Sequence, residues 1–333
     1  MSLHTIVGAG PVGSATARLL ADSGEQVRLL TRSGRGPHHD EIHRIAADAS
    51  DSAALARHAE GAVALYCCAG PAYHRWSTDW PPLGTALIRA AESSGAALVT
   101  TGNLYAYGQV DAPMTEQLPL RPNSVKGQVR ATLWAEALAA HEAGRIRTAE
   151  VRGSDYLGAG AVSPFTAMVL PKVLAGQRGS VPADLDTPHS WTYVGDVART
   201  LVAVAAAKKA WGRAWHVPTA PPLSVRELAT RATELAGAPP GPSGHDARFR
   251  TPPRRTVQSS RTGDARGPIS VAPTFCARLV CRHRRLRDRT DPDRRGTSGD
   301  RRECARTSRD LTRRGILQVH LRERVTPKPV VAR

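Results

Sequence analysis

Short apolar runs alternate with amphipathic stretches over the first 150 residues of the chain. The runs predict strands, and the stretches, in which apolar residues recur every three or four positions, predict helices. The predicted strands are 3–7, 26–31, 42–46, 62–67, 96–101 and 147–151, and the predicted helices are 12–23, 51–60, 83–93 and 124–143. Such alternation predicts an α/β fold, a parallel sheet covered on both faces, with ligands beyond the carboxyl ends of its strands.

The pattern changes after about residue 160. A helix is expected over 164–174, another after Asp196 as its N-cap, a strand over 214–217 and a helix over 224–236. We expect a first α/β domain over residues 1–160 and a small, partly helical lobe over 161–240. The chain can cross back from this lobe to the first domain.

Periodicity stops at a proline- and glycine-rich run over 239–244. Residues 1–242 carry 22 Lys and Arg against 20 Asp and Glu, whereas residues 243–333 carry 24 against 9. Leu, Ile, Val and Phe make up 16 of these last 91 residues, too few for a packed core. We expect 241–333 to be a disordered basic tail, translated out of frame from GC-rich DNA or, alternatively, a genuine arginine-rich interaction tail.

Composition narrows the class of protein. Five cysteines without zinc-type spacing argue against a disulfide scaffold and against a metal site. We expect no signal peptide and no membrane span, because no apolar run approaches ~20 residues. A cytoplasmic protein is the resulting expectation. Nucleic acid is an unlikely partner, because the tail has no interleaved aromatic residues and would bind only nonspecifically.

A glycine-rich turn follows the first predicted strand. Gly8 permits the tight turn, Gly10 lets the backbone approach a pyrophosphate, and Gly13 lets the helix pack against the sheet. The helix opens with Pro11 and Val12, so its N-terminal N–H groups would face the phosphates. The strand–turn–helix–strand context predicts a Rossmann-type, doubly wound dinucleotide-binding fold.

The end of the second strand distinguishes the nucleotides. An acidic residue there binds the free ribose 2′-hydroxyl of NAD, but this chain has Thr31, Arg32 and Ser33 and no acid before Asp40. Arg32 is placed to meet a 2′-phosphate, so NADP is favoured and NAD is the alternative. A solvated loop arginine is the other interpretation.

Polar and aromatic residues follow several of the predicted strands. They are candidates for contact with a small-molecule substrate, although packing is the alternative for each. The candidates are Tyr73 and Trp76, in a loop after the fourth strand, Ser154, Asp155 and Tyr156 after the sixth, and His189 in the lobe.

Residues 1 to about 237 resemble the extended short-chain dehydrogenase/reductase family, in its epimerase/dehydratase branch. The resemblance is carried by the glycine turn, Asp48, Tyr107-Gly108, Lys126-Gly127 and the segment from Tyr193 to Ala198. It implies that Asp48 contacts the adenine, that Ala69 and Gly70 lie along the cofactor, and that the lobe binds a substrate, often a nucleotide sugar. It also implies a homodimer packed through long helices.

The catalytic positions depart from the family pattern of a Ser or Thr and a helical Tyr-x-x-x-Lys. Asn103, Lys126 and Arg130 stand there instead. Lys126 and Arg130 share a helix face, and two adjacent cations disfavour charge on the amine, which would make it an acid or base while Arg130 holds the nicotinamide ribose. Alternatively, both cations bind phosphates. Asn103 would polarise a carbonyl, and Tyr105, two residues on, would supply a phenol.

Two functions therefore compete for the globular part. The first is an NADP-dependent oxidoreductase or epimerase that acts on a small carbonyl or sugar-nucleotide substrate. The second is a cofactor-binding sensor or scaffold without hydride chemistry, which the substituted triad supports.

Overall fold

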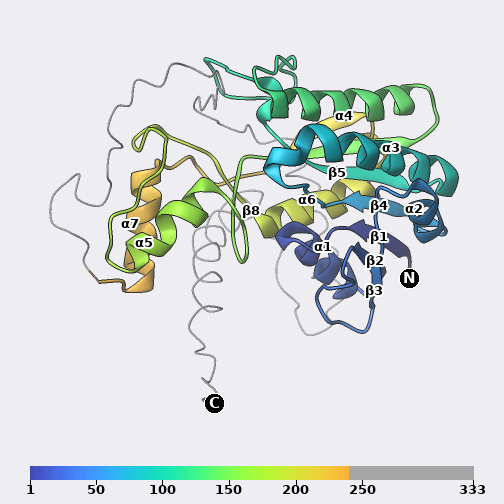
Figure 1. The fold of residues 1–333 in the computed structure, drawn as a ribbon, viewed down its shortest axis with the longest axis horizontal. Coiled ribbons are helices and arrows are strands. Elements are labelled where there is room, and N and C mark those ends of the chain that lie inside the picture. Colours follow the sequence, from blue (N-terminus) through green and yellow to red (C-terminus); the bar gives the residue numbers. More distant parts are fainter. Residues whose placement is uncertain (240–333) are drawn as a thin grey trace, which may run out of the picture.

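The computed structural model describes residues 1–239 of the chain. Seven parallel strands form one sheet in the order β3-β2-β1-β4-β5-β6-β9 (Figure 1). Their bounds are Leu3–Val7 (β1), Gln26–Thr31 (β2), Ile42–Ala46 (β3), Ala64–Cys67 (β4), Ala97–Asn103 (β5), Arg147–Gly153 (β6) and Arg213–His216 (β9). The strand order reverses between β1 and β4, so the expected binding crevice lies at their carboxyl ends. The predicted Rossmann-type α/β fold is confirmed.

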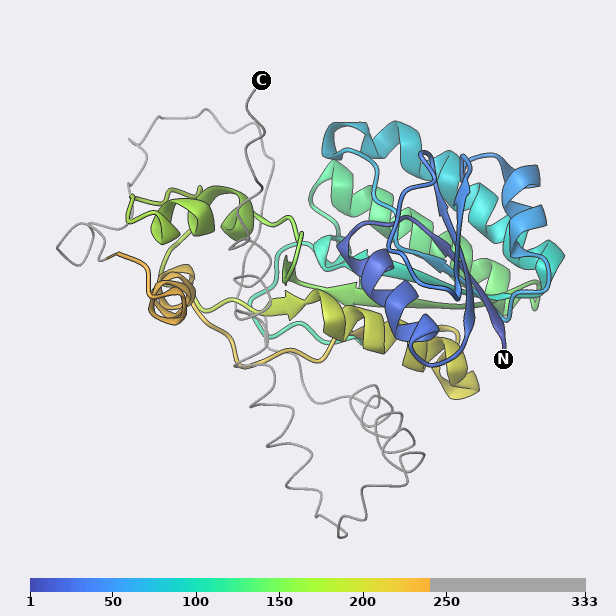
Figure 2. The same ribbon diagram turned by 90° about the horizontal axis from the view of Figure 1, so that it is seen from below.

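Both faces of the sheet are apolar because apolar residues occupy successive positions of its strands, whose side chains point alternately to opposite sides. Ile6 packs on the face covered by α1 (Pro11–Ala21) and α6 (Val194–Ala206), whereas Val7 packs on the other face. The second face is covered by α2 (Ser52–Ala59), α3 (Trp76–Ser94) and α4 (Val125–Glu142). Figures 1 and 2 show these two helical layers on opposite sides of the sheet.

The start of α3 differs from the prediction, which began the helix at residue 83 and placed Tyr73 and Trp76 in a loop. The helix begins at Trp76, directly after a short 3₁₀ turn over Tyr73–Arg75, and contains Pro81 and Pro82. Proline interrupts the hydrogen bonding of a helix. Here burial compensates, because Trp76, Trp80 and Leu87 place their side chains in the core.

The N-cap of α6 was also predicted wrongly. Asp196 lies inside the first turn, and the helix begins at Val194 with Tyr193 as N-cap. The short strand β8 (Trp191–Tyr193) leads straight into the helix, so no polar cap separates the two elements.

A small lobe lies to one side of the sheet and has its own apolar core (Figure 1). Its elements are β7 (Asp155–Leu157) paired with β8, a π-helical turn (Phe165–Val169), α5 (Leu170–Leu174) and α7 (Val225–Ala236). Ser224 caps α7 in a capping box with Glu227. The chain crosses back between these elements, because α6 and β9 belong to the large sheet.

The expectations for residues 241–333, disorder and out-of-frame translation, fall outside the described residues. Within residues 1–239, no helix is both long and apolar enough to cross a membrane. In the same range no group of three or more His, Cys, Asp or Glu side chains is arranged to hold a metal ion.

Candidate functional site

The glycine turn forms a tight cradle between β1 and β4. Gly8 has φ +97°, and a Cβ there would lie 2.7 Å from the Ala69 nitrogen. A Cβ on Gly13 would lie 1.9 Å from the Gly8 carbonyl oxygen, closer than any side chain tolerates. A Cβ on Gly10 would meet no heavy atom within 4 Å. The turn is therefore compact toward the protein and open at Gly10, which fits the close approach of a pyrophosphate.

The N-terminus of α1 opens beside this cradle. Gly10 is the N-cap without a side-chain hydrogen bond, Pro11 occupies the first turn, and that turn contains no acidic residue. Val12 and Gly13 are buried against the sheet. The first-turn N–H groups have no partners within the helix, and the dipole favours an anion here. The residues present therefore fit a nicotinamide dinucleotide, whose diphosphate would lie on this helix end, with Ala69 and Gly70 along its other side.

The end of β2 carries the predicted ribose contacts. Thr31 donates its hydroxyl to the Arg35 carbonyl oxygen, and Arg32 and Ser33 are exposed. Hydrogen bonds from the Ser50 N–H and hydroxyl, and then the charge of Arg32, hold the pKa of Asp48 below its usual range. Asp48 is the residue expected at the adenine, and the charge of Arg32 reaches it. The guanidinium is exposed at the edge where a 2′-phosphate is expected.

An aromatic–lysine cluster, which consists of Tyr73, Trp76, Tyr105 and Lys126, lies after the carboxyl ends of β4 and β5. The Tyr73 ring stacks on Trp76 at 5.0 Å between centroids, and Trp76 lies 6.1 Å from Tyr105. The Tyr73 and Tyr105 hydroxyl oxygens are 3.1 Å apart. The Lys126 Nζ sits 4.4 Å from the centre of the Tyr73 ring. The structure thus brings together two candidate catalytic residues and two candidate substrate contacts.

The start of α4 is held against this cluster. Ser124 accepts a hydrogen bond from the Gly127 N–H as N-cap, and a Cβ on Gly127 would lie 2.6 Å from the Tyr105 carbonyl oxygen. This close approach sets Lys126 beside the segment that follows β5. The Asn103 Oδ1 accepts the Tyr105 N–H at 3.1 Å. This bond occupies the Oδ1, so the predicted polarisation of a carbonyl by Asn103 would use its Nδ2 as the donor.

The predicted substrate residues after β6 form a second group. The His189 Nε2 lies 3.3 Å from the Asp155 Oδ2 and 3.4 Å from the Ser154 hydroxyl, and His189 is buried. Tyr156 donates its hydroxyl to the Gly102 carbonyl oxygen at 2.9 Å. Asn103 pairs in register with Gly153, the residue before Ser154. The two groups therefore flank the end of β5.

Arg130 points into the core. Its Nη2 donates to the Glu150 Oε1 and to the Thr101 carbonyl oxygen, both at 2.8 Å, and its side chain is 5% exposed. The Glu150 Oε2 also accepts from the Arg152 Nε at 2.6 Å. The charged core formed by Arg130, Glu150 and Arg152 was missed by the sequence analysis. The sequence feature that could have indicated this charged core is the placement of Glu150 and Arg152 two positions apart in a strand buried on both faces.

Glu150 of the charged core lies directly under the end of β5. A Cβ on Gly102 would lie 2.6 Å from the Glu150 Oε1, so a side chain at residue 102 would collide with the carboxylate. Glu150 and the Thr101 carbonyl oxygen both bind the Arg130 guanidinium, which therefore has a structural role. The contact of Arg130 with a nicotinamide ribose stays a prediction.

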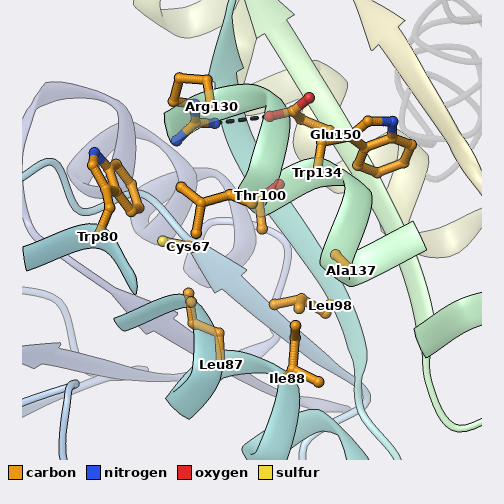
Figure 3. A pocket seen from close by; sticks show the side chains of 12 residues that line it. Cys67, Trp80, Leu87, Ile88, Leu98, Thr100, Arg130, Trp134, Ala137 and Glu150 are labelled. Atoms are coloured by element: carbon orange, nitrogen blue, oxygen red, sulfur yellow. Dashed lines mark hydrogen bonds and ion pairs between the residues drawn. The ribbon is translucent and has the colours of Figure 1, made fainter. Parts of the chain in front are cut away.

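A cavity of about 30 Å³ adjoins the charged core, between α3, α4 and the sheet. Figure 3 shows Arg130, Glu150 and Trp80 along one side of it, with Leu87, Ile88 and Leu98 on the other. Its volume suits a water-sized group and is far below the ~300 Å³ at which ligand pockets begin. It is a packing defect beneath the site and not the cofactor crevice.

His216, at the end of β9, is buried next to this network. Its Nε2 lies 2.8 Å from the Tyr107 hydroxyl, and its backbone N–H donates to the Glu116 Oε1. Burial is the largest cause that lowers the pKa of His216 from 6.5 to about 4. The imidazole is therefore neutral in the folded protein at pH values where it is charged in the unfolded chain.

This depressed pKa predicts a pH-dependent loss of stability. Between pH 6.5 and about 4 the unfolded chain binds a proton at residue 216 that the folded protein does not bind, so the free energy of unfolding falls as the pH falls. The slope from this group is at most ~1.4 kcal/mol per pH unit. Urea unfolding between pH 7 and about 5 should show a shallower decline for His216→Asn than for the wild type. Equal slopes in the two proteins would contradict the prediction.

Comparison with known proteins agrees with this architecture. Residues 5–217 match the family model described as the NAD dependent epimerase/dehydratase family. No curated protein matches the chain.

Solved structures that resemble the chain include UDP-glucose 4-epimerase from Brucella ovis in complex with NAD, with a TM-score of 0.65, 19% identity, and 84% of this chain and 92% of that chain covered. UDP-glucose 4-epimerase from Thermotoga maritima with UDP-glucose has a TM-score of 0.62 and 17% identity, and the match covers 74% of this chain and 88% of that chain. A double mutant of dTDP-glucose 4,6-dehydratase from Streptomyces venezuelae has a TM-score of 0.62, 22% identity, and 75% and 87% covered. At these identities the structures establish the fold alone. The match of the family model over most of the globular part shows that the chain belongs to the NAD-dependent epimerase/dehydratase family.

Proposed function

We propose that the protein is an NADP-dependent oxidoreductase or epimerase that acts on a sugar nucleotide or another small carbonyl compound. The observation that carries the cofactor choice is the exposed Arg32 at the end of β2, where a carboxylate would be needed to bind a free 2′-hydroxyl. Among the similar structures, one epimerase contains NAD and another contains UDP-glucose, and a third protein is a dTDP-glucose 4,6-dehydratase. These ligands and this activity support a sugar nucleotide as the class of substrate.

When bound, the nicotinamide would supply the site for hydride transfer. The chain's own residues would then do three things. The glycine cradle and the N-terminus of α1 would hold the diphosphate, Arg32 would bind the 2′-phosphate, and Asn103 would orient a carbonyl oxygen. The small lobe would close over the substrate next to Ser154, Asp155 and His189.

Replacement of Arg32 by alanine should abolish the preference for NADP. A guanidinium–phosphate contact contributes about 1.5–3 kcal/mol, so the Kd for NADP is expected to rise by roughly ten- to hundredfold while the Kd for NAD changes little. Calorimetric titration with both dinucleotides measures this. Arg35→Ala, an exposed arginine of the same loop, is the matched control and should keep the preference. The proposal fails if the wild type binds the two dinucleotides equally.

A non-catalytic NADP-binding sensor or scaffold is the second candidate. One observation favours it: Arg130, which the resemblance places at the position of the family's lysine, is bonded to Glu150 in the core. The two functions separate when the protein is incubated with NADP⁺ or NAD⁺ and UDP-glucose, UDP-glucuronic acid or dTDP-glucose, and products are followed by mass spectrometry and NMR. Binding of the dinucleotide without any product supports the sensor. The homodimer packed through long helices remains a prediction.

A further inference from the structure

We propose that Tyr105 and Tyr73 form the proton-transfer pair of this site, with Lys126 as the cation that stabilises it. In this arrangement Tyr105 exchanges a proton with the substrate oxygen, and Tyr73 connects Tyr105 to solvent. The inference rests on the proposed function, because it assigns the acid and base of that reaction. The pair would take the place of the tyrosine that the family pattern has on this helix, because α4 contains no tyrosine.

The contact between the two phenols carries the proposal. Their oxygens are 3.1 Å apart, a hydrogen-bond distance at which either group can be the donor. Tyr105 is partly buried, whereas Tyr73 is 55% exposed. The pair therefore leads from the end of β5 to bulk water, which is the path a proton needs when the substrate covers the inner phenol.

The position of Tyr105 links the pair to the expected site of reaction. Its N–H is bonded to Asn103 at the end of β5, the strand end that the two groups of candidate residues flank. Tyr73 follows β4, three residues after Gly70, which borders the glycine cradle. Both phenols therefore belong to segments that begin at the carboxyl edge, where the order of the sheet predicts the ligand.

Lys126 supplies the electrostatic part. Its Nζ lies 4.4 Å from the centre of the Tyr73 ring, and Trp76 stacks on the same ring and holds its orientation. A cation over a phenol ring is attracted to it, and it stabilises negative charge that develops on the oxygen when a proton leaves. Lys126 thus acts on Tyr73 as a positioning residue.

The other tyrosines close to β5 are less suited to this role. The Tyr156 hydroxyl is bonded to the Gly102 carbonyl, and the Tyr107 hydroxyl lies against His216. Burial is the largest cause that raises the pKa of both phenols. Both hydroxyls are bonded inside the protein, whereas the Tyr105 hydroxyl is bonded to that of Tyr73, a side chain that is 55% exposed.

Reduction of a carbonyl adds one hydride and one proton to the substrate. The carbonyl carbon accepts a hydride with its electron pair from a dihydronicotinamide, and the C=O π bond breaks. The carbonyl oxygen takes the proton of Tyr105. Tyr105 then takes the proton of Tyr73, and Tyr73 takes one from water. The substrate ends as an alcohol and the nicotinamide ends oxidised, and every transfer is reversed for oxidation of an alcohol.

Phenylalanine variants test the pair. The panel of UDP-glucose, UDP-glucuronic acid and dTDP-glucose first identifies the reaction of the wild type. Tyr105→Phe should then lower its turnover by about a hundredfold or more, the usual contribution of a general acid or base. Tyr73→Phe should lower it by roughly tenfold, because water can replace the outer phenol only partly. Tyr66→Phe, which removes a phenol from the sheet core, is the control and should retain turnover. Lys126→Met should lower turnover, and Lys126→Arg should restore part of it.

Two further readouts measure binding and the accessibility of the phenols instead of turnover. Quenching of tryptophan fluorescence should give the same NADP affinity for Tyr105→Phe and wild type, so a loss of activity is not a loss of binding. Tetranitromethane should nitrate Tyr73 and Tyr105 in the free protein, and NADP⁺ with the active sugar nucleotide should protect Tyr105, as mapped by mass spectrometry.

The outcomes separate the two proposals. An active wild type with an equally active Tyr105→Phe variant overturns the phenol pair and leaves the proposed function intact. Unprotected nitration of Tyr105 in the presence of both ligands also overturns the pair. A wild type that binds NADP but converts no member of the panel overturns the proposed function and, with it, this assignment.

Discussion

Replacement of Glu150 by glutamine is expected to lower the free energy of unfolding by about 3–5 kcal/mol. The carboxylate is shared by Arg130 and Arg152 at 2.8 Å and 2.6 Å, and all three side chains are at most 5% exposed. Glutamine keeps the shape but removes the only negative charge of this trio. Two guanidinium groups would then stay buried without a counter-ion, and the bond from Arg130 to the Thr101 carbonyl oxygen would offset only part of their desolvation penalty. Urea unfolding of the full chain measures the loss.

Glu92→Gln is the matched control for this experiment. Glu92 pairs with Arg145 at the surface, where the side chains are 29% and 54% exposed. An exposed ion pair contributes about 0–1 kcal/mol, so this variant should unfold almost like the wild type. A loss for Glu150→Gln no greater than that for Glu92→Gln would show that the charged core does not stabilise the fold.

Gly13→Ala should impair both folding and cofactor binding. A Cβ at this position would lie 1.9 Å from the Gly8 carbonyl oxygen and 3.1 Å from the Cys68 Cβ, so α1 and the glycine turn must move apart. Forcing a methyl group into such a contact costs about 1–3 kcal/mol. The displaced turn would also misplace the N–H groups that bind the diphosphate. Thermal unfolding with and without NADP measures both effects.

Gly10→Ala separates the two consequences. Gly10 has φ −66° and ψ −176°, a conformation that alanine adopts, and its Cβ would meet no protein atom within 4 Å. The variant should therefore fold like the wild type but bind NADP at least about tenfold more weakly, because the methyl group would occupy the space meant for the pyrophosphate. Undiminished NADP affinity in Gly10→Ala would mean that the dinucleotide does not pass over this residue.

Arg130 stands where the resemblance to the family predicts a catalytic lysine. A cation is retained on α4 one turn after residue 126, but it is bonded to Glu150 and to the Thr101 carbonyl instead of standing at the edge of the site. Arg130 supports the backbone of β5 just before Asn103 and Tyr105. Tyr73, Tyr105 and Lys126 lie together on the segments that follow β4 and β5 and at the start of α4, outside this charged core.

Much of the fold could be predicted because it depends on local patterns. Strands β1 and β2 and the end of α7 follow from runs of apolar residues and from caps such as Gly237, which has φ +56°. The glycine turn could be predicted equally well, because the strand before it and the helix after it are adjacent in sequence. The coarse prediction of a nicotinamide-dinucleotide protein of this family is confirmed by the match over residues 5–217.

The contacts of the site required the tertiary structure. The sequence by itself determined which residues follow the strands, namely Tyr73 after β4 and Asn103 and Tyr105 at the end of β5. It also determined that Lys126 lies at the start of the helix α4. Only the folded chain decided that Tyr73 and Tyr105, 32 residues apart, share a hydrogen bond. It also decided that Arg130 pairs with Glu150, 20 residues away, and that Trp76 begins a helix despite two following prolines. The physical reason is that burial and charge pairing depend on neighbours brought together by the packing of α3 and α4 on the sheet, and local propensity carries no information about those neighbours.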